Sequence, residues 1–194
     1  MNRPLPSRSA AALAAVLIAA CGGGEPADVL NPGGTGSNKL SFAYFQRCVM
    51  PALETAITAP GGGTNTCASG GCHGNANGTG GALRLIEAAP LVDLSNPDNT
   101  ASKVRLTDMY KNYYSALGMT VPGDVSQSRL LLKPLVKGVL HGGGQILADE
   151  QDPVARLFSY WITHPVPKST DEFSTVANSM FTPADQNTGA CNTL

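Results

Sequence analysis

One short segment constrains the fold of this 194-residue chain more than any other. Cys67 and Cys72 are separated by four residues, His73 directly follows the second cysteine, and Gly74 follows the histidine. The surrounding stretch, residues 61–82, is rich in glycine, which lets the backbone approach a flat group closely. The chain must therefore place two thiols and one imidazole in a single glycine-rich loop.

These side chains indicate covalent attachment of haem. Two cysteine thiols can add to the two vinyl groups of a haem, and the adjacent histidine can then bind the iron from one face. The usual signal has two residues between the cysteines, whereas this chain has four. Two alternatives therefore stay open. One is a Cys67–Cys72 disulfide, and the other is a zinc site built from Cys67, Cys72, His73 and His141.

The chain offers few candidates for a second axial ligand of the iron. Its only other histidines are His141 and His164. His141 is followed by three glycines that would let its loop press an imidazole over a flat ring, so it is the preferred candidate. His164 and Met119 are reserve candidates. Arg129, Lys133 and Trp161 could hydrogen-bond the propionates of a haem.

The N-terminus predicts export and lipid anchoring. Residues 1–20 carry Arg3 and Arg8 and an apolar run too short to span a bilayer, as in a signal peptide. The run ends at Cys21 in a sequence that resembles the lipobox of bacterial lipoproteins, which implies acylation of Cys21 and attachment to a membrane. With Gly22 next, the resemblance favours the outer membrane, facing the periplasm or the cell surface. An ordinary secretory signal is the alternative.

Composition predicts one loop-rich domain after this signal. The sequence is 42% hydrophobic but contains 22 glycines, 14 prolines and a single tryptophan. Without residues 1–20, 11 basic and 14 acidic residues remain, a net charge of −3, and no basic run indicates nucleic-acid binding. We expect a lipidated flexible tether over 21–40 and a domain over 41–194. Hydrophobic spacing and capping residues predict helices at 41–58, 101–117 and 126–132 and a short one near 171–180. They also predict a helix that Asp152-Pro153 opens and that ends at His164, before Pro165.

Several segments in order resemble class I c-type cytochromes, and more narrowly a group of exported bacterial cytochrome c-like domains, many of planctomycete type. The matching stretches are Cys72-His73-Gly74, residues 81–85, Val121-Pro122-Gly123-Asp124, residues 128–134, His141-Gly142-Gly143-Gly144 and Tyr160-Trp161-Ile162. They extend over about 42–164.

The resemblance implies an all-α, small helical domain wrapped around one haem c. The haem would be bonded to Cys67 and Cys72 and ligated by His73 and His141. It further implies a single-electron carrier with protein redox partners rather than an enzyme, and a disulfide between Cys48 and Cys191. A five-coordinate haem peroxidase or sensor, and a haem-free interaction module stapled by disulfides, are the alternatives.

Overall fold

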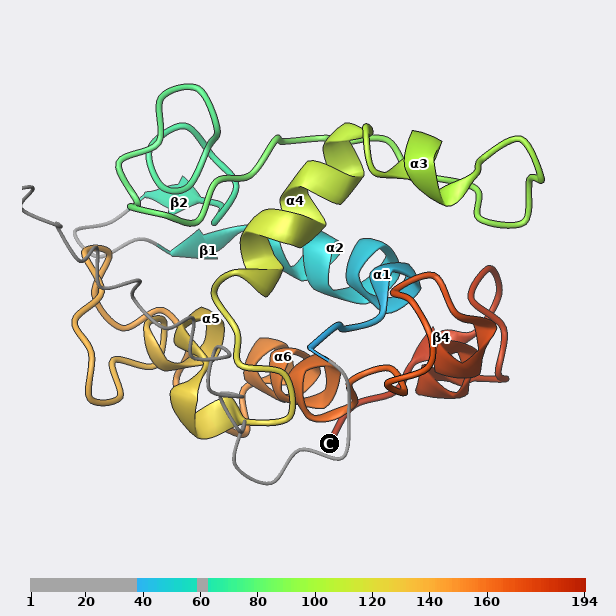
Figure 1. Ribbon diagram of the computed structural model, residues 1–194. Helices are drawn as coiled ribbons and strands as arrows, with labels where there is room; N and C mark the ends of the chain where they lie inside the picture. Colours follow the sequence, from blue (N-terminus) through green and yellow to red (C-terminus); the bar gives the residue numbers. More distant parts are fainter. Residues whose placement is uncertain (1–37, 59–62) are drawn as a thin grey trace, which may run out of the picture. The chain divides into compact units, whose positions relative to one another are not determined.

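The computed structural model describes residues 38–58 and 63–194 (Figure 1). The predicted signal peptide, Cys21 and residues 21–37 of the predicted tether lie outside the described residues. Leu40 is already fully buried, so packing begins within the last residues of that tether. Within the described ranges, no helix has both the length and the apolar character needed to cross a bilayer.

The prediction of an all-α domain wrapped around a haem is wrong. The described residues form short helical segments joined by long loops, together with two small antiparallel sheets. Strand β1 (Ile57–Thr58) pairs with β2 (Thr64–Asn65), and β3 (Phe181–Thr182) pairs with β4 (Ala190–Cys191). The abundant glycine and proline end helices early, while β-branched residues such as Ile57, Thr58 and Thr64 favour extended backbone.

The first helical region is shorter than predicted and changes its winding. It consists of α1 (Phe42–Tyr44), the π-helical turn η1 (Phe45–Val49) and α2 (Met50–Leu53), so it ends before 58. Ser41 caps its start, as expected, by accepting a hydrogen bond from the Tyr44 N–H at 3.1 Å. Pro51 has no N–H for the carbonyl of Arg47, four residues earlier, and the wider π turn accommodates this missing donor.

The helix expected over 101–117 is two helices. Helix α3 (Ala101–Val104) ends, and α4 (Asp108–Leu117) begins anew because the Thr107 hydroxyl accepts a hydrogen bond from the Tyr110 N–H. Gly118 follows α4 as its C-cap, as the sequence predicts. A threonine that can cap a following turn thus interrupts an otherwise continuous hydrophobic pattern.

The later elements are also shorter than the predicted ones, one helix by only a single residue. They are η2 (Val125–Gln127), α5 (Arg129–Leu132), α6 (Pro153–Thr163) and η3 (Thr175–Met180). Helix α6 begins where predicted, because Asp152 caps it and Pro153 fits its first turn, and it ends at Thr163, one residue before the predicted His164. The expected helix at 126–132 divides into a 3₁₀ turn and a short α-helix, and the expected one near 171–180 is a 3₁₀ turn.

An aromatic core joins α6 and α4 to the first helical region. The Trp161 Nε1–H donates to the Ser41 carbonyl at 3.0 Å, and the Tyr113 hydroxyl donates to the Leu40 carbonyl at 2.9 Å. The rings of Phe45 and Trp161 lie 5.4 Å apart, and both side chains are fully buried. These contacts fix the segment that leads, through α2, to the cysteine loop.

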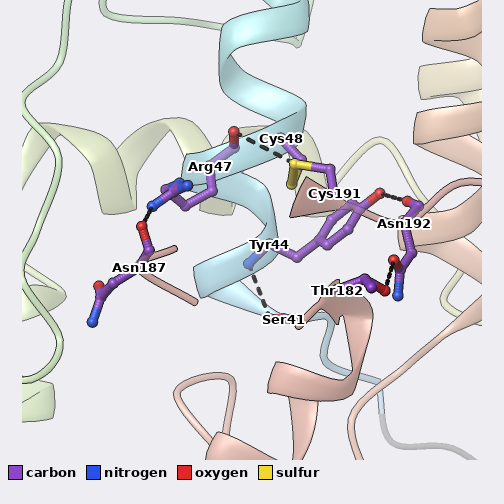
Figure 2. Close-up of a disulfide and its surroundings, with 8 residues drawn as sticks. All are labelled: Ser41, Tyr44, Arg47, Cys48, Thr182, Asn187, Cys191 and Asn192. Atoms are coloured by element: carbon purple, nitrogen blue, oxygen red, sulfur yellow. Dashed lines mark hydrogen bonds between the residues drawn. A yellow bond between two sulfur atoms is a disulfide. The ribbon is translucent and has the colours of Figure 1, made fainter. Parts of the chain in front are cut away.

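A disulfide ties the C-terminal segment to the first helical region (Figure 2). It joins Cys48 in η1 to Cys191 in β4, the pairing that the resemblance implies. Around it the Tyr44 hydroxyl donates to the Asn192 carbonyl, and the Arg47 guanidinium donates to the Asn187 carbonyl. The chain end is therefore held by one covalent bond and several polar contacts.

Candidate functional site

The cysteine loop closes on itself through backbone hydrogen bonds. The His73 N–H donates to the Cys67 carbonyl at 2.9 Å, and the Cys72 N–H donates to the Ser69 carbonyl at 3.0 Å. Ala68, only 1% exposed, anchors this turn in the core, and its N–H donates to the Leu53 carbonyl at the end of α2. The two residues beyond the usual spacing thus form part of a closed turn, and the His73 N–H is still hydrogen-bonded to the Cys67 carbonyl.

Glycines allow this loop to coil tightly around the His73 ring. A Cβ at Gly80 would lie 2.5 Å from Cε1 of His73, and one at Gly78 would collide with the Gly74 carbonyl. The chain then returns past the histidine, since the Gly80 N–H donates to the Cys72 carbonyl and the Leu85 N–H to the His73 carbonyl. Glycine at these positions permits an approach that any side chain would prevent.

The His73 imidazole is oriented for binding a metal through Nε2. Its Nδ1 lies 3.3 Å from the Leu83 carbonyl oxygen, which can only accept, so Nδ1 carries the proton. Burial holds the pKa of His73 below its ordinary value, and the nearby His141, Arg84 and Lys133 act in the same direction. The neutral form, with a lone pair on Nε2, is the form that binds metals.

The His141 imidazole has the same kind of orientation. Its Nδ1 lies 2.8 Å from the Gly144 carbonyl oxygen, which leaves Nε2 as the available ligand atom. The base of its loop is closed by two N–H groups, of Ile146 and Leu147, that donate to the Pro134 carbonyl. Leu147 is buried, whereas Leu140, next to the histidine, is 88% exposed.

The structure brings these two histidine rings close together, with nearly parallel planes, from loops 68 residues apart in the sequence. Their ring centroids are 6.2 Å apart and the ring planes differ by 10°. Metal–imidazole bonds of about 2.0–2.1 Å, with a ring radius of about 1.1 Å, place two rings on opposite sides of one ion about 6.3 Å apart. The separation therefore matches that of two axial ligands of one metal ion.

The two thiols near His73 lie in different surroundings. Cys67 and Cys72 are both free, so the alternative Cys67–Cys72 disulfide is not formed in this structure. Cys67 packs against the core, and burial, with a smaller contribution from neighbouring Cys72, raises its pKa to about 11. The Cys72 sulfur accepts a hydrogen bond from the Asn65 side-chain amide at 3.4 Å.

The other ligands considered from the sequence lie elsewhere. His164 is exposed at the end of α6, where its ring stacks on Tyr160 at 4.0 Å. Met119 lines a shallow depression with Ala82 and Tyr114. Trp161 is buried with its N–H bonded to Ser41, so it is not available to a propionate.

Several residues of the site carry no signal in the sequence. Asn65, which contacts Cys72, and Leu83, whose carbonyl orients His73, belong to no ligand motif. Arg84 lies in the matching stretch 81–85, but it was not predicted as a site residue. The Arg84 guanidinium donates a hydrogen bond to the Gly78 carbonyl. Arg84 and Lys133 both act electrostatically on His73.

The residues present fit a haem better than zinc. Over the described part of the chain, no three His, Cys, Asp or Glu side chains gather as a metal site, so the four zinc candidates do not form one. A haem requires only two axial imidazoles from the protein, with thiols at its edge. The Thr66 hydroxyl, one residue before Cys67, is buried without a hydrogen-bond partner.

Comparison of the chain with protein-family models, with curated proteins and with solved structures gave no match in any of the three. The likeness to c-type cytochromes therefore remains a prediction from the sequence motifs. The geometry of the two histidines is an independent observation, and it concerns the site rather than the fold.

Proposed function

We propose that this protein is an exported single-electron carrier that holds one haem covalently, and so is a c-type cytochrome by its chemistry. The observation that carries the proposal is the pair of parallel imidazoles, His73 and His141, at the separation expected across one iron ion. The proposal does not depend on an all-α fold. It depends on two loops whose backbone carbonyls fix both rings.

The chain's own residues have separate roles in this proposal. His73 and His141 would hold the iron through Nε2, while the carbonyls of Leu83 and Gly144 keep each Nδ1 protonated and each ring in place. Cys72 and Cys67 bond the edge of the haem as thioethers. The haem, when bound, supplies a reversible one-electron change between ferrous and ferric iron.

The charges around the site suit an anionic group. Arg84 and Lys133 lie close enough to His73 to act on its protonation. Two positive side chains can offset the two propionate carboxylates that a haem carries. The sequence suggested Arg129, Lys133 and Trp161 as partners of the propionates. Of these three, Lys133, on the segment that leads to His141, is the one that acts electrostatically on His73.

Ligation by two imidazoles favours electron transfer over catalysis. With both axial positions taken by protein side chains, no position remains for a substrate or for oxygen. Two imidazoles also give a lower reduction potential than a histidine–methionine pair, because a thioether favours ferrous iron more strongly. The redox partners would be proteins of the cell envelope, reached from a lipid anchor at Cys21.

Absorption spectroscopy of the full chain tests this function. We expect haem that survives acid–acetone extraction, a sharp alpha band after reduction, and no rapid binding of carbon monoxide. His141→Ala should convert the low-spin spectrum to a high-spin one, whereas His164→Ala, which changes the surface histidine, should leave it unaltered. Haem lost on extraction, or a His141→Ala spectrum identical to wild type, would refute the proposal.

Electron paramagnetic resonance tests the geometry of the pair directly. Two axial imidazoles with parallel planes give a rhombic low-spin ferric signal, whereas perpendicular planes give one very large g value. The 10° angle between the rings predicts the rhombic signal. A large-g signal would show that the rings turn on binding iron, and a purely high-spin signal would count against His141 as ligand.

A further inference from the structure

The side chain of Asn65 holds the sulfur of Cys72 in one place. Its Nδ2–H donates to the Cys72 Sγ at 3.4 Å, within the range of a hydrogen bond to sulfur. Asn65 lies in β2, where it is the register partner of Ile57 in β1. The contact therefore joins the β1–β2 sheet to the second cysteine of the loop.

Both ends of the Asn65 amide are fixed. Its Oδ1 accepts a hydrogen bond from the Thr66 N–H at 2.9 Å, which determines the direction in which Nδ2 points. A Cβ at Gly71 would lie 3.1 Å from Nδ2, so glycine there gives the amide room beside Cys72. An amide held in this way is a rigid donor, and it restricts the rotation of the thiol that it contacts.

The other cysteine has no comparable support. The Cys67 sulfur is packed against the hydrophobic core, and no side-chain donor is directed at it among the described residues. The two thiols of the motif therefore lie in different surroundings. One is presented by a polar contact at the site, and the other lies against the core.

We propose that Asn65 is a positioning residue that makes Cys72 the principal point of haem attachment, with Cys67 secondary. This inference rests on the proposed function. In the attachment step the Cys72 thiol adds to a vinyl group. The S–H bond breaks, a bond forms between sulfur and the inner vinyl carbon, and the hydrogen goes to the outer carbon, with no net oxidation. Asn65 favours this step by fixing the direction of the sulfur before it reacts.

Haem attachment in two cysteine backgrounds separates positioning from a general structural role. The variant Asn65→Ser is uncharged and too short to contact Cys72, but its hydroxyl can still accept from the Thr66 N–H. With Cys67→Ser present, so that only Cys72 can react, we expect Asn65→Ser to lower the thioether yield about fivefold, the effect of losing one hydrogen bond. With Cys72→Ser present, the yield at Cys67 should not change.

Mass spectrometry of the full chain measures these yields, and Asn75→Ser, an exposed asparagine of the same loop, is the matched control. An equal loss in both backgrounds would show that Asn65 acts only on the fold, and no loss in either would show that its contact is irrelevant. Either result would overturn the inference.

Alkylation of the haem-free chain tests the same contact without any haem. Iodoacetamide reacts with the thiolate, and an N–H that donates to sulfur favours this form, so losing the contact should slow alkylation of Cys72 in Asn65→Ser but not in Asn75→Ser. If no variant and no wild-type chain forms a thioether, the proposed function fails. Unchanged alkylation of Cys72 would instead refute the positioning role alone.

Discussion

At the scale of single residues, Gly80 sets how closely the cysteine loop approaches the His73 ring. A Cβ at this position would lie 2.5 Å from Cε1 of His73 and 2.8 Å from the Cys72 carbonyl oxygen. The neighbouring Leu83 carbonyl fixes the same ring from Nδ1. A single methyl group at Gly80 must therefore displace the ring, the loop or both.

We expect Gly80→Ala to disturb the site more than the fold. Overpacking of this kind costs about 1–3 kcal/mol, so the free energy of unfolding should fall by that amount. In the haem-loaded protein the low-spin spectrum should weaken, because the displaced ring no longer lies opposite His141. Urea unfolding and absorption spectra measure the two effects.

Gly70→Ala is the control for this change, because a Cβ there would meet no atom within 4 Å. It should leave both stability and spectrum close to wild type. If Gly80→Ala had the same stability and the same spectrum as Gly70→Ala, the loop backbone would have shifted to make room for the methyl group without moving His73.

Sequence motifs could identify the reactive side chains of the site but not the groups that orient them. Cys67, Cys72 and His73 are distinctive because few other chemistries need two thiols followed by an imidazole. His141 could be identified as a candidate ligand because the chain contains only three histidines. Asn65 lies in no matching stretch. Leu83 and Gly144 do lie in matching stretches, but they act through backbone carbonyls, which any residue type can provide, so the motifs do not reveal their roles.

At the scale of elements, Glu172 joins three parts of the chain that are distant in sequence. Its carboxylate is only 3% exposed and accepts from Arg105 Nε at 2.9 Å and from the Tyr110 hydroxyl at 2.8 Å. Its backbone carbonyl accepts from the Phe42 N–H at 2.9 Å. The segment before η3 is thereby bound to the α3–α4 junction and to α1.

Glu172→Gln should destabilise the protein at neutral pH by about 1 kcal/mol, because it removes the charge that Arg105 and Tyr110 contact, while the half-exposed Arg105 can still be solvated by water. Burial opposes ionisation of Glu172, but its backbone N–H, Tyr110 and Arg105 outweigh it and hold its pKa below the ordinary value. This stabilisation is therefore complete above about pH 4.3 and is lost as the pH falls through the lowered pKa.

Urea unfolding of wild type and Glu172→Gln between pH 7 and pH 3 measures this dependence. The difference in the free energy of unfolding should be constant near neutrality and shrink in acid. Glu87→Gln, at an exposed position, is the control and should change little. A difference that stayed constant down to pH 3 would contradict the assigned role of the Glu172 charge.

Helices could be predicted where capping residues and hydrophobic spacing agree. Helix α6 begins where predicted because Asp152, Pro153 and a continuous apolar face all indicate the same start. The helix predicted to extend to 58 failed because hydrophobic spacing alone cannot distinguish helix from strand at Ile57. The division at Thr107 was missed because a threonine that caps a helix looks the same in sequence as one inside it.

At the scale of the described domain, the structure depends on links between distant segments because its helices are short. None of the described helices exceeds the 11 residues of α6, and the strands have two residues each. Such elements are marginal by themselves and need tertiary contacts. This is why the hydrophobic pattern and the resemblance suggested too regular a helical fold.

The strongest of these links is the Cys48–Cys191 disulfide, which closes a loop of 143 residues of sequence separation. On the chain-entropy model, a bridge over such a loop stabilises the folded state by about 5 kcal/mol. The double variant Cys48→Ser/Cys191→Ser should therefore unfold at a much lower urea concentration than wild type. Adding a reductant to wild type should give the same shift.

Figure 2 shows why the loss should be concentrated at the C-terminal segment. The contacts of Tyr44 with Asn192 and of Arg47 with Asn187 remain in the variant, but each is a single hydrogen bond and worth about 1 kcal/mol. Hydrogen exchange should therefore accelerate first in residues 181–192, while the loops of His73 and His141 keep their protection. Cys67→Ser is the control, because that thiol forms no disulfide. Equal unfolding midpoints with and without reductant would show that the Cys48–Cys191 disulfide contributes no stability to the domain.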